Sequence, residues 1–169
     1  MKRFSKFLVW NVILVLFDQL TKYMAQTKLM GTDGISLIDG VFRLQYLENR
    51  GAAFGSFQNK IIFLVIITIA IFSGIVYVYT KLPEQKRYFP LQYLLIFISA
   101  GAIGNFLDRL INNYVIDFLY FEWIDFPIFN VADCYVTISA VILFILGIFY
   151  YKDEDFEFLK QKKDVTHGK

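Results

Sequence analysis

The chain contains three long stretches without a charged residue, of 20, 20 and 18 residues. They cover 61–80, 88–107 and 134–151. Because a helix needs about 20 residues to cross the hydrocarbon core of a bilayer, each stretch predicts a membrane-spanning helix. A fourth apolar stretch, 7–17, reaches spanning length only if its helix continues through Asp18 and Lys22. We therefore predict four spans, at about 7–26, 61–80, 90–109 and 132–151.

The basic start of the chain allows another interpretation of the first span. Lys2, Arg3 and Lys6, followed by an apolar run, are also typical of a secretory signal peptide. The small residues of a cleavage site are missing, because Asp18 to Lys22 follow the run instead. We expect this helix to be retained.

Four spans place both termini on the same side of the membrane. That side holds the N-terminus, the connection 81–89 and a tail over 152–169, which together carry 11 of the 17 Lys and Arg residues. Positive charge remains cytoplasmic in membrane proteins, so we predict that both termini are cytoplasmic. The basic residues concerned are Lys2, Arg3, Lys6, Lys81, Lys86, Arg87, Lys152, Lys160, Lys162, Lys163 and Lys169.

Two segments then lie outside. The longer one, 27–59, contains β-like runs at 35–38 and 41–47 separated by glycine-containing turn signals, and it predicts a small sheet on the outer membrane face. The shorter one, 110–129, is rich in aromatic residues, which favour the membrane interface. The fold class is therefore membrane all-α: one domain over 1–169 with four transmembrane helices, a small extracytoplasmic β-sheet cradle and an interfacial loop or helix.

Composition excludes several classes of protein. Hydrophobic residues make up 57% and charged residues 19% of the 169, against about 45–50% and about 25% in soluble domains. This balance excludes an ordinary soluble domain, a disordered chain and a nucleic-acid binder. The single cysteine, Cys134, excludes an internal disulfide framework and a multi-cysteine metal site.

Charged residues inside a span are costly, at about 2.5–3.5 kcal/mol near the helix centre, and normally have a use. Asp18 and Lys22 lie four residues apart on one face of the first helix, so they can neutralise each other. Two interpretations stay open for them: an ion pair that helps the helices pack, or support for a functional site.

The third helix ends in a polar stripe at helical spacing. Small residues there indicate a close helix contact, and amides and charges on the same stripe indicate a polar interior. A helix contact with interfacial charges is the simpler alternative. The stripe contains Gly101, Gly104, Asn105, Asp108, Arg109 and Asn112.

Asn130 and Asp133 begin the fourth helix, where an N-cap and a first-turn carboxylate would be sufficient to explain both. Asp117 has no such explanation, because it lies among apolar neighbours between the third and fourth helices.

Carboxylates are the only catalytic groups concentrated at membrane level. The one histidine, His167, lies near the end of the tail, which argues against His-dependent triads and His-ligated metal sites. Two aspartates brought together share a proton: the ionised one accepts a proton from water, and the protonated one polarises a carbonyl. Asp117 and Asp133 form such a pair if the loop between them folds back. We expect neither a metal nor a cofactor.

Five short motifs follow one another along the chain. They are Asp18-Gln19-Leu20-Thr21-Lys22, Asn49-Arg50-Gly51-Ala52-Ala53-Phe54, Gly101 to Arg109, Val115-Ile116-Asp117-Phe118 and Phe129-Asn130-Val131-Ala132-Asp133. In this order they resemble the type II (lipoprotein) signal peptidases, which are four-helix bacterial membrane aspartyl proteases.

The resemblance implies that Asp117 and Asp133 are the catalytic dyad. We hypothesise that Asn49 and Arg50 help to hold the substrate backbone. Cys134 departs from the family pattern, since many relatives carry Ser there. The substrate-binding or supporting positions would be Asp18, Lys22, Asn49, Arg50, Gly51, Gly101, Asn105, Asp108, Arg109 and Asn130.

The resemblance also implies a substrate, a prolipoprotein whose lipobox cysteine bears a diacylglyceryl group. Cleavage on the N-terminal side of that cysteine would release the signal peptide. We expect a monomer in the bacterial plasma membrane with its active site near the outer leaflet, the sheet as a cradle and the 110–129 loop arching over the cleft. Membrane lipid would be its other partner, and it would bind no nucleic acid.

A non-enzymatic proton-coupled transporter or channel subunit is the alternative. Such proteins usually hold their ionisable groups near the membrane midplane, in interrupted helices. Here the predicted spans are uninterrupted, and the carboxylates lie at helix ends.

Overall fold

The computed structural model describes residues 2–51 and 60–159. Its four long helices are each long and apolar enough to cross a membrane, which confirms the predicted fold class. α1 extends furthest beyond its predicted span, because its helical hydrogen bonding continues into the basic residues at both ends. Motif residues 52–54 and the tail from 160 on, with His167, lie outside the described residues. The helices are α1 (Lys2–Leu29), α2 (Ile61–Lys81), α3 (Phe89–Asn112) and α4 (Val131–Phe149).

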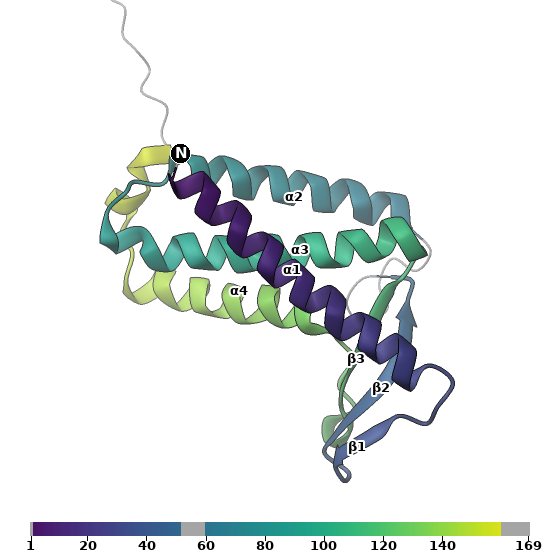
Figure 1. Cartoon of the computed structure of the whole chain (residues 1–169). Helices are drawn as coiled ribbons and strands as arrows, with labels where there is room; N and C mark the ends of the chain where they lie inside the picture. The colour runs from purple at the N-terminus through teal and green to yellow at the C-terminus, as the bar shows by residue number, and fades with distance from the viewer. Residues whose placement is uncertain (1, 52–59, 160–169) are drawn as a thin grey trace, which may run out of the picture.

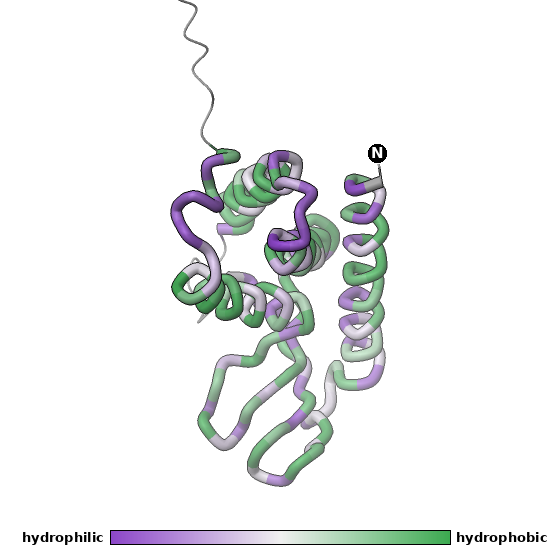
Figure 2. The backbone as a smooth tube through the Cα atoms, turned by 90° about the vertical axis from the view of Figure 1, so that its left-hand side faces the viewer, coloured by the Kyte–Doolittle hydropathy of each residue, from purple (hydrophilic) through white to green (hydrophobic). Residues whose placement is uncertain are grey.

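The central helix of the bundle is α3. It packs against α1, α2 and α4 (Figure 1) and is more buried than any of them. The other helices expose large apolar side chains, such as Leu16, Ile66 and Phe144. Figure 2 shows the helices mainly hydrophobic and the connections near the N-terminal end of the bundle hydrophilic. Extensive exposed apolar surface of this kind is typical of a membrane-facing protein.

A three-stranded antiparallel sheet lies at the other end of the bundle, in the order β1 (Ile35–Ile38), β2 (Phe42–Asn49) and β3 (Val115–Phe121) (Figure 1). The first two strands belong to the small sheet predicted for the segment 27–59 and pair antiparallel. The segment 110–129, predicted as an interfacial loop or helix, contains the short helix η3 (Glu122–Ile124). It also supplies β3, which was not predicted and forms because this segment pairs with β2.

A hydrophobic cluster fixes β3 against α1. Ala25 and Leu29 of α1 pack with Ile116 and Phe118 of β3, and all four side chains are buried. These two strand residues flank Asp117, so the packing also fixes the position of that carboxylate.

A β-bulge in β2 decides which face of the sheet Asn49 occupies. Leu44 lies opposite Leu119, whereas Leu47 lies opposite Asp117, so β2 contains one residue more than β3 over this interval. Side chains alternate between the faces of a sheet, and an extra residue moves later side chains to the other face. Because of the bulge, Asn49 shares a face with Asp117.

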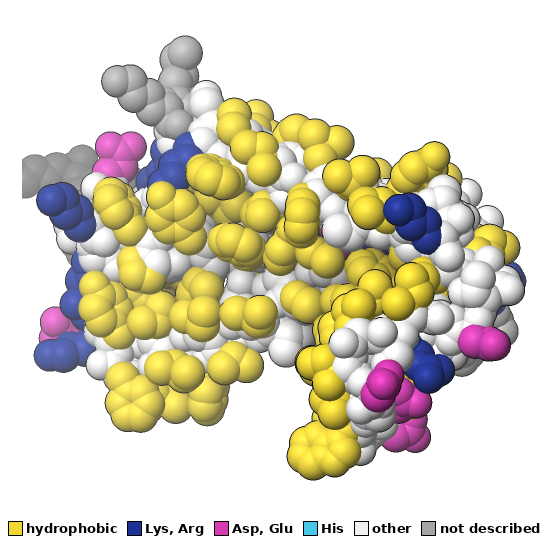
Figure 3. Space-filling model, turned by 60° about the horizontal axis from the view of Figure 1, so that its bottom comes forward, with side chains coloured by type: hydrophobic (Ala, Val, Ile, Leu, Met, Phe, Trp, Pro, Cys, Tyr) yellow, Lys and Arg dark blue, Asp and Glu magenta, His cyan; other side chains and the backbone are white. Residues whose placement is uncertain are grey.

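The opposite end of the bundle is closed by two short helices, η2 (Lys86–Tyr88) and η4 (Asp153–Leu159). Arg87 donates two hydrogen bonds of 2.6 Å to the carboxylate of Asp155. This ion pair ties the connection between α2 and α3 to the segment after α4. In Figure 3 several Lys and Arg side chains lie at this end of the apolar surface, and others lie at the end that carries the sheet.

Candidate active site

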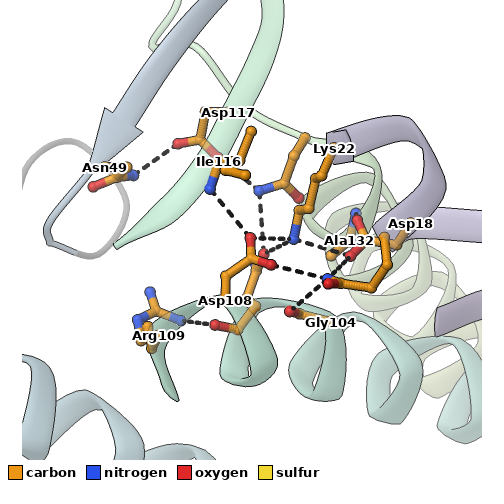
Figure 4. Close-up of polar contacts among 12 residues, drawn as sticks. Asp18, Lys22, Asn49, Gly104, Asp108, Arg109, Ile116, Asp117 and Ala132 are labelled. Atoms are coloured by element: carbon orange, nitrogen blue, oxygen red, sulfur yellow. Dashed lines mark hydrogen bonds and ion pairs between the residues drawn. The ribbon is translucent and has the colours of Figure 1, made fainter. Parts of the chain in front are cut away.

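Asp117 lies in β3 with only 1% of its surface exposed. Its two carboxylate oxygens accept hydrogen bonds from two amides: Asn49 Nδ2 donates to Oδ2 at 2.9 Å, and Asn130 Nδ2 donates to Oδ1 at 2.6 Å. Figure 4 shows Asn49 reaching Asp117 from the neighbouring strand. The carboxylate is therefore held from β2 on one side and from the start of α4 on the other.

Asp133 lies in the first turn of α4 as part of a capping box. The side chain of Asn130 accepts from the backbone N–H of Asp133, and Asp133 accepts from the backbone N–H of Asn130. Asn105 of α3 also donates to Asp133 Oδ1 at 2.8 Å. The capping interpretation is thus confirmed, and the same Asn130 also contacts Asp117.

Asn130 therefore connects the two aspartates. It is fully buried, and its one side chain caps the helix that carries Asp133 and donates to Asp117. The loop between the aspartates does fold back, through β3 and an isolated bridge between Leu119 and Phe129. The sequence allowed the two aspartates to lie close together, and in the structure both contact Asn130.

The surroundings of Asp117 favour its protonated form. Burial, and next the neighbouring charge of Asp133, raise the pKa of Asp117 from 3.8 to about 7. Near neutral pH this group exchanges a proton readily, which is the property that general acid–base catalysis needs.

A second buried cluster adjoins the aspartates. The ammonium of Lys22 lies 2.9 Å from Asp18 Oδ2, 2.9 Å from Asp108 Oδ2 and 2.8 Å from Asn105 Oδ1. The helices α1 and α3 supply these groups, and Figure 4 shows them converging between the helices and β3. The ion pair predicted from the i,i+4 spacing is present, and it extends to a third charge.

Gln19 belongs to this cluster, although no role for it was predicted. Its Nε2 donates to Asp108 Oδ1 at 2.9 Å, to Asp18 Oδ2 at 3.2 Å and to the carbonyl of Gly104 at 3.2 Å. The only signal in the sequence was its place inside the first motif.

Arg109 and Gly51 lie beside the site. Arg109 Nη2 donates to the carbonyl of Gly51 at 3.1 Å, and its Nη1 donates to the carbonyl of Asn105 at 3.2 Å. The guanidinium therefore connects α3 to the end of the β2 segment.

Arg50 and Gly101 lie apart from the aspartates. Arg50 is exposed and pairs with Glu48 at 3.2 Å, close to the ring of Tyr114. Gly101 forms the close contact of α3 with α4 and presents no polar side chain. Among the described residues, no group of three or more His, Cys, Asp or Glu side chains is arranged to hold a metal ion.

The fold and the site together define a class: an integral membrane protein of the aspartic peptidase kind, with paired aspartates at one end of a four-helix bundle. Comparison with known proteins specifies the family. A family model described as signal peptidase (SPase) II matches residues 10–149.

Two relatives and one solved structure support the same assignment. The lipoprotein signal peptidase of Caldanaerobacter subterraneus subsp. tengcongensis is 45% identical over 136 residues, which cover 80% of this chain and 90% of the relative. That of Streptococcus pyogenes serotype M1 is 37% identical over 150 residues, covering 89% and 95%. A bacterial membrane enzyme solved by the in meso method at 2.3 Å matches with a TM-score of 0.77 and 32% identity over 94% of both chains.

The chain belongs to the signal peptidase II family, the lipoprotein signal peptidases, and is an aspartic peptidase of the bacterial membrane. This assignment decides against the transporter or channel subunit considered from the sequence.

Proposed function

We propose that Asp117 and Asp133 are the catalytic dyad and that they hydrolyse the peptide bond on the N-terminal side of a diacylglyceryl-modified cysteine in prolipoproteins. One observation carries this proposal: Asn130 donates from its side-chain amide to the carboxylate of Asp117 and from its backbone N–H to the carboxylate of Asp133, so one buried residue holds both carboxyl groups. The chain's similarity to the lipoprotein signal peptidases supports a prolipoprotein as substrate.

The reaction requires that Asp117 and Asp133 together carry one proton. The ionised aspartate accepts a proton from water, whose oxygen forms a bond to the scissile carbonyl carbon. The protonated aspartate donates a hydrogen bond to the carbonyl oxygen and stabilises the tetrahedral intermediate. A proton then passes to the leaving nitrogen, and the C–N bond breaks. The raised pKa of Asp117 supports its role as the protonated partner.

The surrounding amides support a role in substrate binding. Asn49 and Gly51 lie at the end of β2, beside the dyad, and Arg109 holds the carbonyl of Gly51. A substrate strand in a lipid-flanked cleft needs partners for its peptide groups, because unpaired ones are costly there. We assign Asn49, Asn105, Arg109 and Asn130 to supporting the dyad and its substrate, and Arg50 to the rim.

The arrangement of the chain supports a topology. η4 and the N-terminal end of α1 lie at the same end of the bundle, and the sheet lies at the far end (Figure 1). Together with the positive-inside rule this supports cytoplasmic termini, a dyad near the outer leaflet and a sheet that cradles the substrate. Every group assigned to the site comes from one chain, which supports a monomer as the working unit.

Replacing either aspartate tests the dyad. We expect Asp117→Asn and Asp133→Asn each to reduce cleavage of a diacylglyceryl prolipoprotein by about 10³-fold or more, because asparagine cannot exchange the proton. Release of the signal peptide by purified protein, followed on a gel, measures this loss.

Asp33→Asn is the matched control. Asp33 is an exposed aspartate in the connection between α1 and β1, so the same chemical change there should leave cleavage at the wild-type rate. Cleavage at a normal rate by either dyad variant would remove that residue from the mechanism.

A further inference from the structure

The cluster around Lys22 is closed to solvent. Lys22, Asp18 and Asp108 expose 1%, 0% and 2% of their surfaces, so none of them is available to a substrate. The sequence left open whether this ion pair serves packing or a site. The partners of the two carboxylates decide between these interpretations.

Each carboxylate also accepts a backbone N–H from the residue that directly precedes a dyad aspartate. Asp108 Oδ2 accepts from Ile116 N at 3.1 Å, one residue before Asp117. Asp18 Oδ1 accepts from Ala132 N at 2.9 Å, one residue before Asp133. Figure 4 shows the carboxylates of Asp18 and Asp108 on either side of the ammonium of Lys22.

A third connection runs through Asn105. Lys22 donates to Asn105 Oδ1, and this fixes the orientation of the amide so that its Nδ2 donates to Asp133. An ammonium has three N–H donors, and the three acceptors around Lys22 use all of them. Lys22, the one buried cation among the described residues, is therefore connected to the side chain of Asp133 through Asn105 and to the backbone beside both aspartates through Asp18 and Asp108.

We propose that Lys22, acting through Asp18, Asp108 and Asn105, is a positioning residue that sets the separation and orientation of Asp117 and Asp133. The inference rests on the proposed dyad. β3 and α4 are separate elements, and this ion triad holds both of them by backbone amides. A packing pair would need neither of these amide contacts.

Lys22→Met tests the inference, since methionine has a similar length and no charge or donor. We expect kcat to fall by about 10²-fold, the usual effect of a misplacement of about 1 Å. We expect KM to change by less than about threefold, because Lys22 does not touch substrate. A larger KM with an unchanged kcat would assign Lys22 to substrate binding and would overturn the proposal.

The pH profile provides a second readout. Asp117 is faced by Lys22 from α1, by Asp108 and Arg109 from α3, by Asp133 from α4 and by the uncharged Asn49 from β2. The positive charge of Lys22 lowers the pKa of Asp117, although burial and Asp133 outweigh it. Lys22→Met should therefore move the alkaline limb of the profile to higher pH, and an unmoved limb contradicts the inference.

Ser99→Ala is the matched control. Ser99 is fully buried and donates to Asn11 at 2.7 Å, so it also joins α3 to α1, but the pair has no contact with the dyad. Its removal should leave kcat and the pH profile at wild-type values. If Lys22→Met fails to accumulate, Asp108→Asn replaces it, with the same expected fall in kcat, and wild-type kinetics there would overturn the inference.

The dyad variants in the same assay separate the two proposals. If Asp117→Asn or Asp133→Asn remains active, the proposal that these residues are the catalytic dyad is wrong. If both dyad variants are inactive and Lys22→Met has wild-type kinetics, only the positioning role of Lys22 is wrong.

Discussion

Asp117 accepts two amide hydrogen bonds that favour its ionised form, and its pKa is nevertheless raised. Burial of the carboxyl and the charge of Asp133 outweigh the donors Asn49 and Asn130. The same amides that hold the group in place therefore also limit how far its pKa rises, to about 7. Position and proton affinity are set by the same few contacts.

Activity should decline as pH rises through about 7. Above its raised pKa, Asp117 loses the proton that the mechanism requires on the pair. We expect an alkaline limb in kcat/KM with its midpoint near pH 7, measured as the rate of signal-peptide release across about two units on either side.

The stability of the folded protein should also decrease as pH rises. Between pH 3.8 and about 7 the folded chain binds a proton at Asp117 that the unfolded chain has lost, so this group destabilises the fold progressively as pH rises through that window. Above about pH 7 its effect on stability is constant.

A kcat/KM that stays flat from acid to alkaline pH would contradict the assignment of the catalytic proton to Asp117.

The sequence indicates the two aspartates of the proposed dyad more clearly than the residues around them. Asp117 and Asp133 stood out because carboxylates are rare at membrane depth. Gln19 did not, because an uncharged amide at a helix end has many possible partners. Arg50, predicted to hold substrate beside Asn49, follows the last residue of β2 and pairs with Glu48, so its role in substrate binding stays a prediction.

At the scale of elements, α3 and α4 approach closely because α3 carries glycines at the contact. A Cβ atom at Gly101 would lie 2.5 Å from the carbonyl oxygen of Ala132 and 2.7 Å from Val136 Cγ2. The first of these is backbone and cannot rotate away. Since Ala132 precedes Asp133, the distance between the helices also affects the site.

Gly101→Ala should therefore separate the helices and destabilise the protein by about 1–3 kcal/mol, the usual effect of overpacking. Gly147→Ala in α4 is the control, because its Cβ would meet nothing within 4 Å. Alanine favours a helix by roughly 0.5–1 kcal/mol over glycine, so the control should be neutral or stabilising. Thermal unfolding in detergent compares them, and equal shifts in Tm would contradict the close contact.

The elements differ in how far the sequence specifies them. The spans follow from apolar length, which is a local property, and Asn130 indicates where α4 begins. β3 was missed because Val115–Phe121 becomes a strand only by pairing with β2, which is distant in the sequence. The bulge between Leu44 and Leu47 is equally non-local, and it decides which face Asn49 occupies.

At the scale of the whole molecule, the two ends of the bundle differ in chemistry. One end carries η2, η4 and the bidentate pair of Arg87 with Asp155. The other carries the sheet and the site. Arg87 donates two hydrogen bonds to Asp155 and holds its pKa at about 2, so this pair remains charged at all physiological pH values. A permanently charged end is suited to an aqueous face, which we propose to be the cytoplasmic one.

Cysteine accessibility tests this orientation. Cys134→Ala removes the single native cysteine and provides a background for two variants, Asp33→Cys between α1 and β1 and Lys86→Cys in η2, both at exposed positions. A membrane-impermeant maleimide applied to intact spheroplasts should label Asp33→Cys, whereas Lys86→Cys should react only after the membrane is opened. If only Lys86→Cys is labelled before the membrane is opened, the protein has the opposite orientation and the dyad lies at the inner leaflet. That result would be incompatible with cleavage of a substrate whose lipid-modified cysteine lies at the outer leaflet.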